Sequence, residues 1–140
     1  MDESWLEIRD YDGAGYQPLV DYGTWRVAIL NFLEGVRPER NDRFERHTET
    51  DEVFVLTRGR GVLLLGGNDA QVGTIHPAAM TVGKIYNIKR NAWHGVLLTE
   101  DASVLIVENK DTGEHNSEYC ALSPEQRQQI IQIAQREDIK

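Results

Sequence analysis

The feature of this sequence that most constrains its fold is a succession of short β-strand patterns between Thr24 and Asn109. Segments rich in β-branched and aromatic residues alternate here with clusters of Gly, Asn and Asp, of which Gly66–Asp69 is the clearest. About nine strands at such spacing are typical of an all-β barrel or sandwich. We therefore predict an antiparallel β-barrel or double-sheet roll over about 24–109.

Two segments at the N-terminal side add to this pattern. Residues 24–34 carry apolar side chains at both parities, so this strand is expected to be covered on both faces. Residues 4–9 alternate apolar and polar side chains and are interpreted as a first short strand, with a Gly-containing turn region over 11–18.

In the C-terminal segment the apolar residues recur at a different spacing. Ser123 offers an N-cap, Pro124 stands at the first helical position, and Gln126 completes a capping box. Ile130, Ile131 and Ala134 recur at helical spacing. We predict one C-terminal α-helix over about 124–136, and a single domain over 1–140.

Composition and charge exclude several classes of partner. The chain of 140 residues carries a formal net charge of −8, which opposes binding to nucleic acid and to anionic membrane surfaces. The N-terminus has neither the basic nor the apolar segment of a secretion signal, and the lone Cys120 cannot form an internal disulfide. These features predict a cytoplasmic protein. The sequence also has no G-x-S-x-G, P-loop or dinucleotide-binding fingerprint.

The chemistry is concentrated in residues 45–59. In a β-strand alternate side chains share a face, so Glu45, His47 and Glu49 would point the same way. Charged side chains directed inward are rare unless they are paired or bound to a metal. A second histidine, His94, opens another apolar run. Histidines and carboxylates on paired strands are the ingredients of a mononuclear metal centre.

These two stretches resemble the paired motifs of the cupin superfamily of small (RmlC-like) β-barrels. In the first, four residues separate His47 from Glu52 and six separate Glu52 from Gly59, as that motif requires. Glu45 stands where the motif has its first histidine. In the second, the spacing from Gly83 to His94 is kept, while the Pro and Gly of the motif are replaced within Lys89-Arg90-Asn91, and Leu98 replaces an Asn.

The resemblance implies a double-stranded β-helix (jelly-roll or cupin barrel) that holds one divalent ion, Zn, Fe, Mn or Ni, through His47, Glu52 and His94. Glu45 would be a fourth ligand or a catalytic base. The implied function is a metal-dependent enzyme of isomerase, lyase or dioxygenase type acting on a small polar molecule. Two alternatives stay open: a non-catalytic small-molecule binding or sensing cupin, and a metal-free cupin resembling sugar epimerases, with His47 as base.

Simpler roles are also open for these residues. Glu52 could form a salt bridge with Arg46 or Arg58, and Glu49 reads as a solvated turn residue. His76 and His115 are expected to be exposed. Continued inward parity predicts an apolar wall around the site, formed by Phe54, Val96 and Leu98.

Four basic residues are expected to be solvated, although one or two of them could face a pocket and anchor a carboxylate: Arg26, Arg43, Lys84 and Lys89. Trp5, Leu6 and Ile8 give the N-terminus an apolar weight that a small barrel cannot easily enclose. We therefore also predict a homodimer formed through N-terminal or edge strands.

Overall fold

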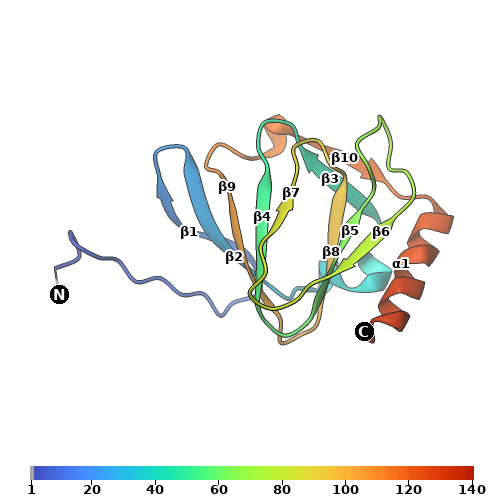
Figure 1. The fold of residues 1–140 in the computed structure, drawn as a ribbon, viewed down its shortest axis with the longest axis horizontal. Coiled ribbons are helices and arrows are strands. Elements are labelled where there is room, and N and C mark those ends of the chain that lie inside the picture. The colour runs from blue at the N-terminus through green and yellow to red at the C-terminus, as the bar shows by residue number, and fades with distance from the viewer. Residues whose placement is uncertain (1) are drawn as a thin grey trace.

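Two five-stranded antiparallel sheets face each other in the computed structural model, which describes residues 2–140 (Figure 1). The first sheet has the order β1 (Gly15–Tyr22), β2 (Trp25–Asn31), β9 (Ser103–Asn109), β4 (Glu52–Arg58), β7 (Tyr86–Ile88). The second has the order β10 (Ser117–Ala121), β3 (Arg43–His47), β8 (His94–Leu98), β5 (Gly61–Leu65), β6 (His76–Ala79). The predicted all-β double-sheet roll is therefore confirmed.

A glycine turn joins the two sheets at the end of the first motif. Gly59 lies between β4 and β5 with a φ of +71°, a backbone region that L side chains rarely adopt. A Cβ at this position would lie 2.5 Å from Cα of Ala102. Both the turn and the close approach of the neighbouring loop therefore require glycine here.

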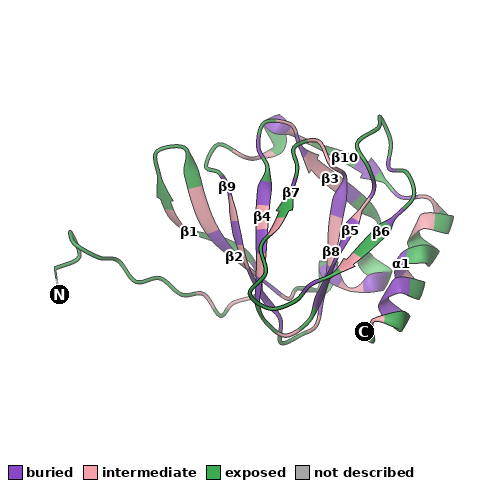
Figure 2. Ribbon diagram, in the orientation of Figure 1, coloured by how far each residue is buried: buried purple, intermediate pink, exposed green. Residues whose placement is uncertain are grey.

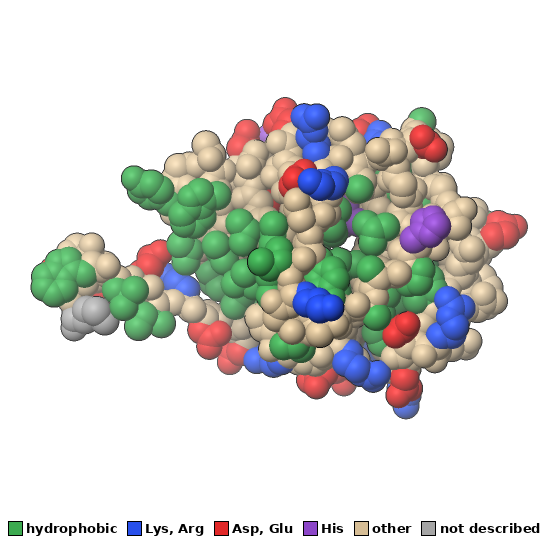
Figure 3. Space-filling model, in the orientation of Figure 1, with side chains coloured by type: hydrophobic (Ala, Val, Ile, Leu, Met, Phe, Trp, Pro, Cys, Tyr) green, Lys and Arg blue, Asp and Glu red, His purple; other side chains and the backbone are tan. Residues whose placement is uncertain are grey.

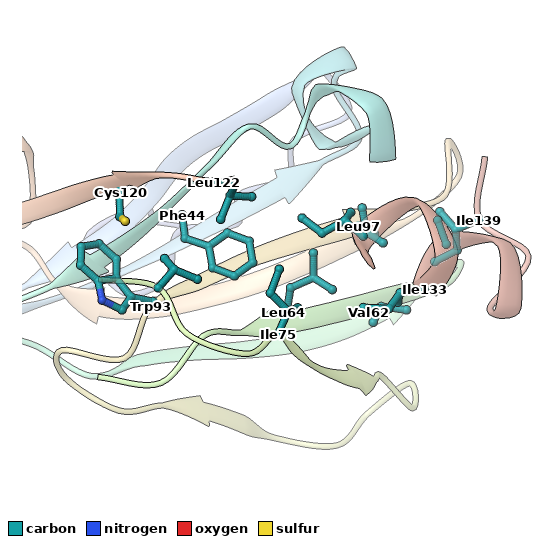
Figure 4. Close-up of a cluster of buried hydrophobic side chains, with 13 residues drawn as sticks. Phe44, Val62, Leu64, Ile75, Trp93, Leu97, Cys120, Leu122, Ile133 and Ile139 are labelled. Carbon is teal, nitrogen blue, oxygen red and sulfur yellow. The ribbon is translucent and has the colours of Figure 1, made fainter. Parts of the chain in front are cut away.

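Buried residues line the facing sides of the sheets, and the core divides into two clusters (Figure 2). One cluster fills the space between the sheets and includes Phe54, Leu56, Val104 and Ile106. The other lies between the second sheet and α1 (Pro124–Arg136) and is shown in Figure 4. The molecule therefore stacks a helix and two sheets, and the site lies between the sheets.

The C-terminal helix begins and ends where the sequence predicted. The side chain of Ser123 accepts a hydrogen bond from the backbone N–H of Gln126 at 3.1 Å. The Gln126 side chain accepts one from the backbone N–H of Ser123 at 2.8 Å, which completes the capping box. Within residues 2–140, no helix is long and apolar enough to cross a membrane.

Three expectations about the termini of the barrel were wrong. Residues 4–9 do not form a strand but lie in an extended, exposed arm (Figure 1). The region 11–18, expected as a turn, already contains the start of β1. The strand β10 follows residue 109, where the strand patterns seemed to end.

Short 3-10 helices occupy Glu34–Val36, Pro38–Arg40 and Glu114–Asn116.

Candidate metal centre

Three strands bring the motif residues to one point. Glu45 and His47 lie on β3, Glu52 begins β4 and His94 begins β8. Each offers a nitrogen or oxygen atom, and these four atoms lie within 4.8 Å of one another. His47, Glu52 and His94 are buried, whereas the side chain of Glu45 is 41% exposed. The predicted convergence of the two motifs inside the barrel is confirmed.

The oxygen of one carboxylate lies at the centre of this group. Oε1 of Glu52 is 3.0 Å from Nε2 of His94 and 3.3 Å from Nε2 of His47. Oε1 of Glu45 is 3.9 Å from each of the same two nitrogens. Apart from these contacts with one another, the three buried atoms, Glu52 Oε1, His47 Nε2 and His94 Nε2, have no hydrogen-bond partner among the described residues. Buried polar atoms are rarely left unpaired without a reason, and a bound ion is one such reason.

The outer nitrogen of each imidazole is held by a second residue. Nδ1 of His94 lies 3.0 Å from the carbonyl oxygen of Ala92, which can only accept, so this nitrogen carries the proton. Nε2 of His94 therefore presents a lone pair to the centre when the ring is neutral. Nδ1 of His47 lies 2.8 Å from Oγ of Ser117 on β10. Such outer contacts are the usual support of metal-binding histidines.

Charge and burial act in opposite directions on these groups. Burial disfavours the charged forms, but the adjacent histidines outweigh it at Glu52 and hold the pKa of that carboxyl below its ordinary value. Burial likewise opposes protonation of His47 and His94, and the Glu52 carboxylate outweighs it, so the pKa of each imidazole is raised. Without an ion, a protonated ring would donate to the Glu52 carboxylate, which itself stays ionised. An ion that binds here has to displace such a proton.

A third buried carboxylate, Glu108 at the end of β9, completes the polar wall. Its Oε1 accepts hydrogen bonds from the Tyr16 hydroxyl at 2.6 Å and from Arg26 at 2.9 Å. Its Oε2 lies 3.9 Å from Nε2 of His47 and has no hydrogen-bond partner within residues 2–140. Burial and the charge of Glu52 raise the pKa of Glu108. Glu108 therefore presents one free oxygen to the centre.

A cavity of about 430 Å³ opens next to these groups. Its apolar lining includes Phe54 and Val96, as predicted, together with Leu30 and Ile106. Leu98 was expected there, but it is fully buried in the core between the sheets and does not line the cavity. The volume falls in the range of small-molecule sites, about 300–1,000 Å³.

The basic residues proposed for a pocket divide into two pairs. Arg26 and Arg43 line the cavity, whereas Lys84 and Lys89 do not. Arg26 is already paired with Glu108. The guanidinium of Arg43 lies 4.4 Å from the centre of the Tyr119 ring, at the edge of the same cavity.

The simpler roles considered for these residues are resolved as follows. Arg46 pairs with Glu118, and Arg58 donates to the carbonyl of Asp101, so neither neutralises Glu52. Glu49 accepts a hydrogen bond from Asn116 at 3.1 Å and lies outside the centre. His76 and His115 are exposed, as expected.

The donors fit a divalent transition-metal ion. Imidazole nitrogen and carboxylate oxygen are the ligand types that Zn, Fe, Mn and Ni accept. The cavity lining carries four carboxylates, on Glu45, Glu52, Glu108 and Glu114, and two guanidiniums, on Arg26 and Arg43, which leaves two excess negative charges when both imidazoles are neutral. A divalent cation would neutralise them.

Comparison with known proteins concerns the fold. No protein-family model matches the sequence, and no curated protein matches it. The capsular polysaccharide assembling protein CapF from Staphylococcus aureus superposes with a TM-score of 0.57 at 15% identity, over 87% of this chain and 34% of CapF. A Streptomyces PAC13 variant with uridine superposes with a TM-score of 0.52 at 12% identity, over 82% of this chain and 85% of PAC13.

Two further solved structures are relevant to the choice of compounds and metal ions for testing. Pac13 is described as a nucleoside dehydratase. The Fe(II) form of HppE superposes with a TM-score of 0.50 at 14% identity, over 67% of this chain and 48% of HppE. At such identities the likeness concerns the fold alone, which is an all-β double-sheet roll with one C-terminal helix.

Proposed function

We propose that this chain is a metal-dependent cupin enzyme acting on a small polar molecule, of isomerase, lyase or dioxygenase type. The observation that carries the proposal is the set of buried atoms on Glu52, His47 and His94 that face only one another. Those three residues would hold one divalent ion, Zn, Fe, Mn or Ni, and Glu45 would be its fourth ligand or a base beside it. Three ligands with a further open position are typical of a catalytic site rather than a structural one.

The bound ion would supply Lewis acidity to a carbonyl, hydroxyl or carboxylate of the ligand. Glu45 suits proton transfer because it is the one partly exposed member of the group and lines the cavity. Phe54, Val96 and Ile106 form an apolar wall of the cavity, and such a low-dielectric wall strengthens the electrostatic interactions beside it.

Glu108 would position the ligand. Because Tyr16 and Arg26 both donate to its Oε1, the carboxylate cannot rotate freely, and Oε2 stays directed to the centre. A fixed carboxylate oxygen is a strong acceptor for a ligand hydroxyl. We therefore expect a ligand that carries hydroxyl groups and little negative charge.

Metal titration of the purified protein is the first test. After chelation and dialysis, we expect one equivalent of Zn²⁺, Mn²⁺, Ni²⁺ or Fe²⁺ to bind, measured by calorimetry and elemental analysis. His76→Ala is the matched control, because His76 is exposed and does not belong to the group of four donors. A wild-type protein that binds none of these ions would refute the metal centre and leave a binding module or a metal-free enzyme.

Turnover is the second test. The metal-loaded protein is offered nucleosides, neutral sugars and small organic acids, with product detected by mass spectrometry. The panel includes nucleosides because Pac13 is described as a nucleoside dehydratase, and Fe²⁺ with oxygen because HppE was solved with Fe(II). Binding of a ligand without turnover under all these conditions would favour the sensing alternative.

A further inference from the structure

The outer face of the first sheet is apolar although nothing in the described chain covers it. Along β9 and β4, buried residues such as Val104, Ile106 and Phe54 alternate with partly exposed ones that point away from the core. On β2, Ala28 is buried toward the core, so Val27 and Ile29 point outward. The outward-pointing residues form two neighbouring rows. One row runs Val20, Val27, Val107, Val53 and ends at Asn87, and the next runs Gln17, Ile29, Leu105, Val55.

This face is unusual for an antiparallel sheet. Such a sheet commonly carries apolar residues on its core side and polar residues on the other. Here the two rows contain no charged residue, in a protein whose net charge is −8. Neither core cluster includes these side chains. The sequence predicted that strand 24–34 is covered on both faces, and the structure covers one of them.

The N-terminal arm presents further apolar side chains on the side of the molecule where β1 and β2 lie. It extends away from the barrel near β1 and β2 (Figure 1), and Trp5, Leu6 and Ile8 on it are exposed. The Asn31 side chain donates to the carbonyl of Tyr11 at 3.1 Å, which fixes the base of the arm beside β2. Figure 3 shows hydrophobic side chains on this arm and gathered over β1, β2, β9 and β4.

We propose that a second copy of this chain docks on the outer face of the first sheet, and that the arm of each copy reaches across the other. Two faces of aliphatic side chains complement each other in sheet-on-sheet packing, and a two-fold axis lets both copies use the same patch. Because each copy carries a charge of −8, the two rows, which hold no charged residue, are the part of the surface where two copies can meet with little desolvation of charge.

The exposed area is adequate for a stable pair when the arm is included. Tyr22 and Trp25 pair with each other and share the outward parity of Val20 and Val27. These two residues and Trp5 are 76%, 42% and 79% exposed. With about 150–250 Å² for each aromatic side chain, they offer on the order of 400 Å². A stable interface buries about 800 Å² on each partner, and the two aliphatic rows, Leu6 and Ile8 contribute the remainder.

Pairing through the edge of the same sheet is less favourable. The edge strand β1 contains Pro18, which has no N–H to donate, and its register shifts between Pro18 and Val20. Proline and bulges are the devices that prevent edge-to-edge pairing of strands. The face and the arm, rather than the edge of β1, therefore form the interface.

Sedimentation velocity at micromolar concentration tests the proposal. We expect wild type at twice the chain mass of 16.0 kDa, and Leu105→Lys as a monomer, because the lysine would be buried at the centre of the interface. The matched control is Ile85→Lys, which changes a side chain 74% exposed outside the two rows and stays dimeric. Circular dichroism verifies that each variant is folded.

The arm gives an independent variant that cannot disturb the barrel. Trp5→Ala combined with Ile8→Ala is expected to weaken the dimer more than tenfold. A monomeric wild type would overturn the proposal, since the face would then be covered by the chain's own arm or by an unrelated protein. A folded Leu105→Lys protein that stays dimeric would overturn it as well. Neither result depends on whether the metal centre binds an ion.

Discussion

Oε1 of Glu52 and Nε2 of His94 lie 3.0 Å apart although they belong to different sheets. Glu52 starts β4 in the first sheet, and His94 starts β8 in the second. The centre therefore assembles only when the two sheets pack face to face. The core between the sheets, rather than any local segment, sets the distance between the two motifs.

Replacing His94 by Ala is expected to abolish binding of the ion. The ring supplies one of the unpaired nitrogens of the centre, and its loss should weaken affinity by more than about 100-fold, beyond the 10- to 100-fold effect of outer partners. Calorimetric titration with Zn²⁺ or Mn²⁺ measures this. If His94→Ala binds the ion as wild type does, while His76→Ala also does, the ligand assignment is wrong.

Binding of an ion should also stabilise the fold. An ion that binds only the native state at 100 times its Kd stabilises it by about 2.7 kcal/mol, which raises Tm by several degrees. Thermal unfolding with and without chelator measures the shift. The His94→Ala protein should show none, and an equal shift in both proteins would indicate binding elsewhere.

Ser117→Ala tests the support of His47. The hydroxyl of Ser117 lies 2.8 Å from Nδ1 of His47, and its loss frees the imidazole to rotate. We expect ion affinity to fall by about 10- to 100-fold while one equivalent still binds. Ser4→Ala, in the exposed arm, is the control. Unchanged affinity in Ser117→Ala would mean that this contact does not orient the ring.

The spacing of residues in the two motifs predicted the candidate metal centre, because this spacing determines which face of a strand each side chain lies on and how long each turn is. Four residues between His47 and Glu52 allow a loop that returns the chain into the facing sheet, and Gly59 allows the next turn. Tyr16 and Glu108 were missed for different reasons. Tyr16 was missed because Gly13, Gly15 and Pro18 make the start of β1 look like a turn. Glu108 could have been found, because it continues the inward parity of Val104 and Ile106.

Residues 4–9 alternate apolar and polar side chains but form no strand, and the reason is physical. A strand needs a neighbour for its backbone hydrogen bonds, and the described chain offers this segment none. Periodicity identifies an apolar face, but it does not identify the partner against which that face packs. The same limit applies to the outer face of the first sheet.

Arg26→Met should destabilise the protein strongly, because Glu108 is 3% exposed and would keep a buried charge without its cation. Breaking a buried pair from one side costs about 3–5 kcal/mol. Urea unfolding measures the loss. The double variant Arg26→Met with Glu108→Gln should recover much of it, and equal losses in the single and double variants would contradict a role for this pair.

The contact between α1 and the second sheet should stabilise the site from outside. Ile130 is fully buried in the cluster that contains Phe44, which lies next to Glu45 on β3 (Figure 4). A Cβ on Gly95, next to His94, would lie 2.8 Å from the Phe44 ring, so that ring also packs closely against β8. Ile130→Ala is therefore expected to cost about 2–5 kcal/mol in unfolding free energy.

The matched control is Ile131→Ala, since Ile131 is only partly buried on the adjoining face of the helix. It should cost less than about 1 kcal/mol, because less apolar surface is removed from contact. Because Phe44 links α1 to β3 and β8, Ile130→Ala should also weaken ion binding, whereas Ile131→Ala should not. Equal losses of stability in the two variants would show that α1 does not dock through Ile130. A destabilised Ile130→Ala protein with wild-type ion affinity would show that the helix supports the fold without positioning the centre.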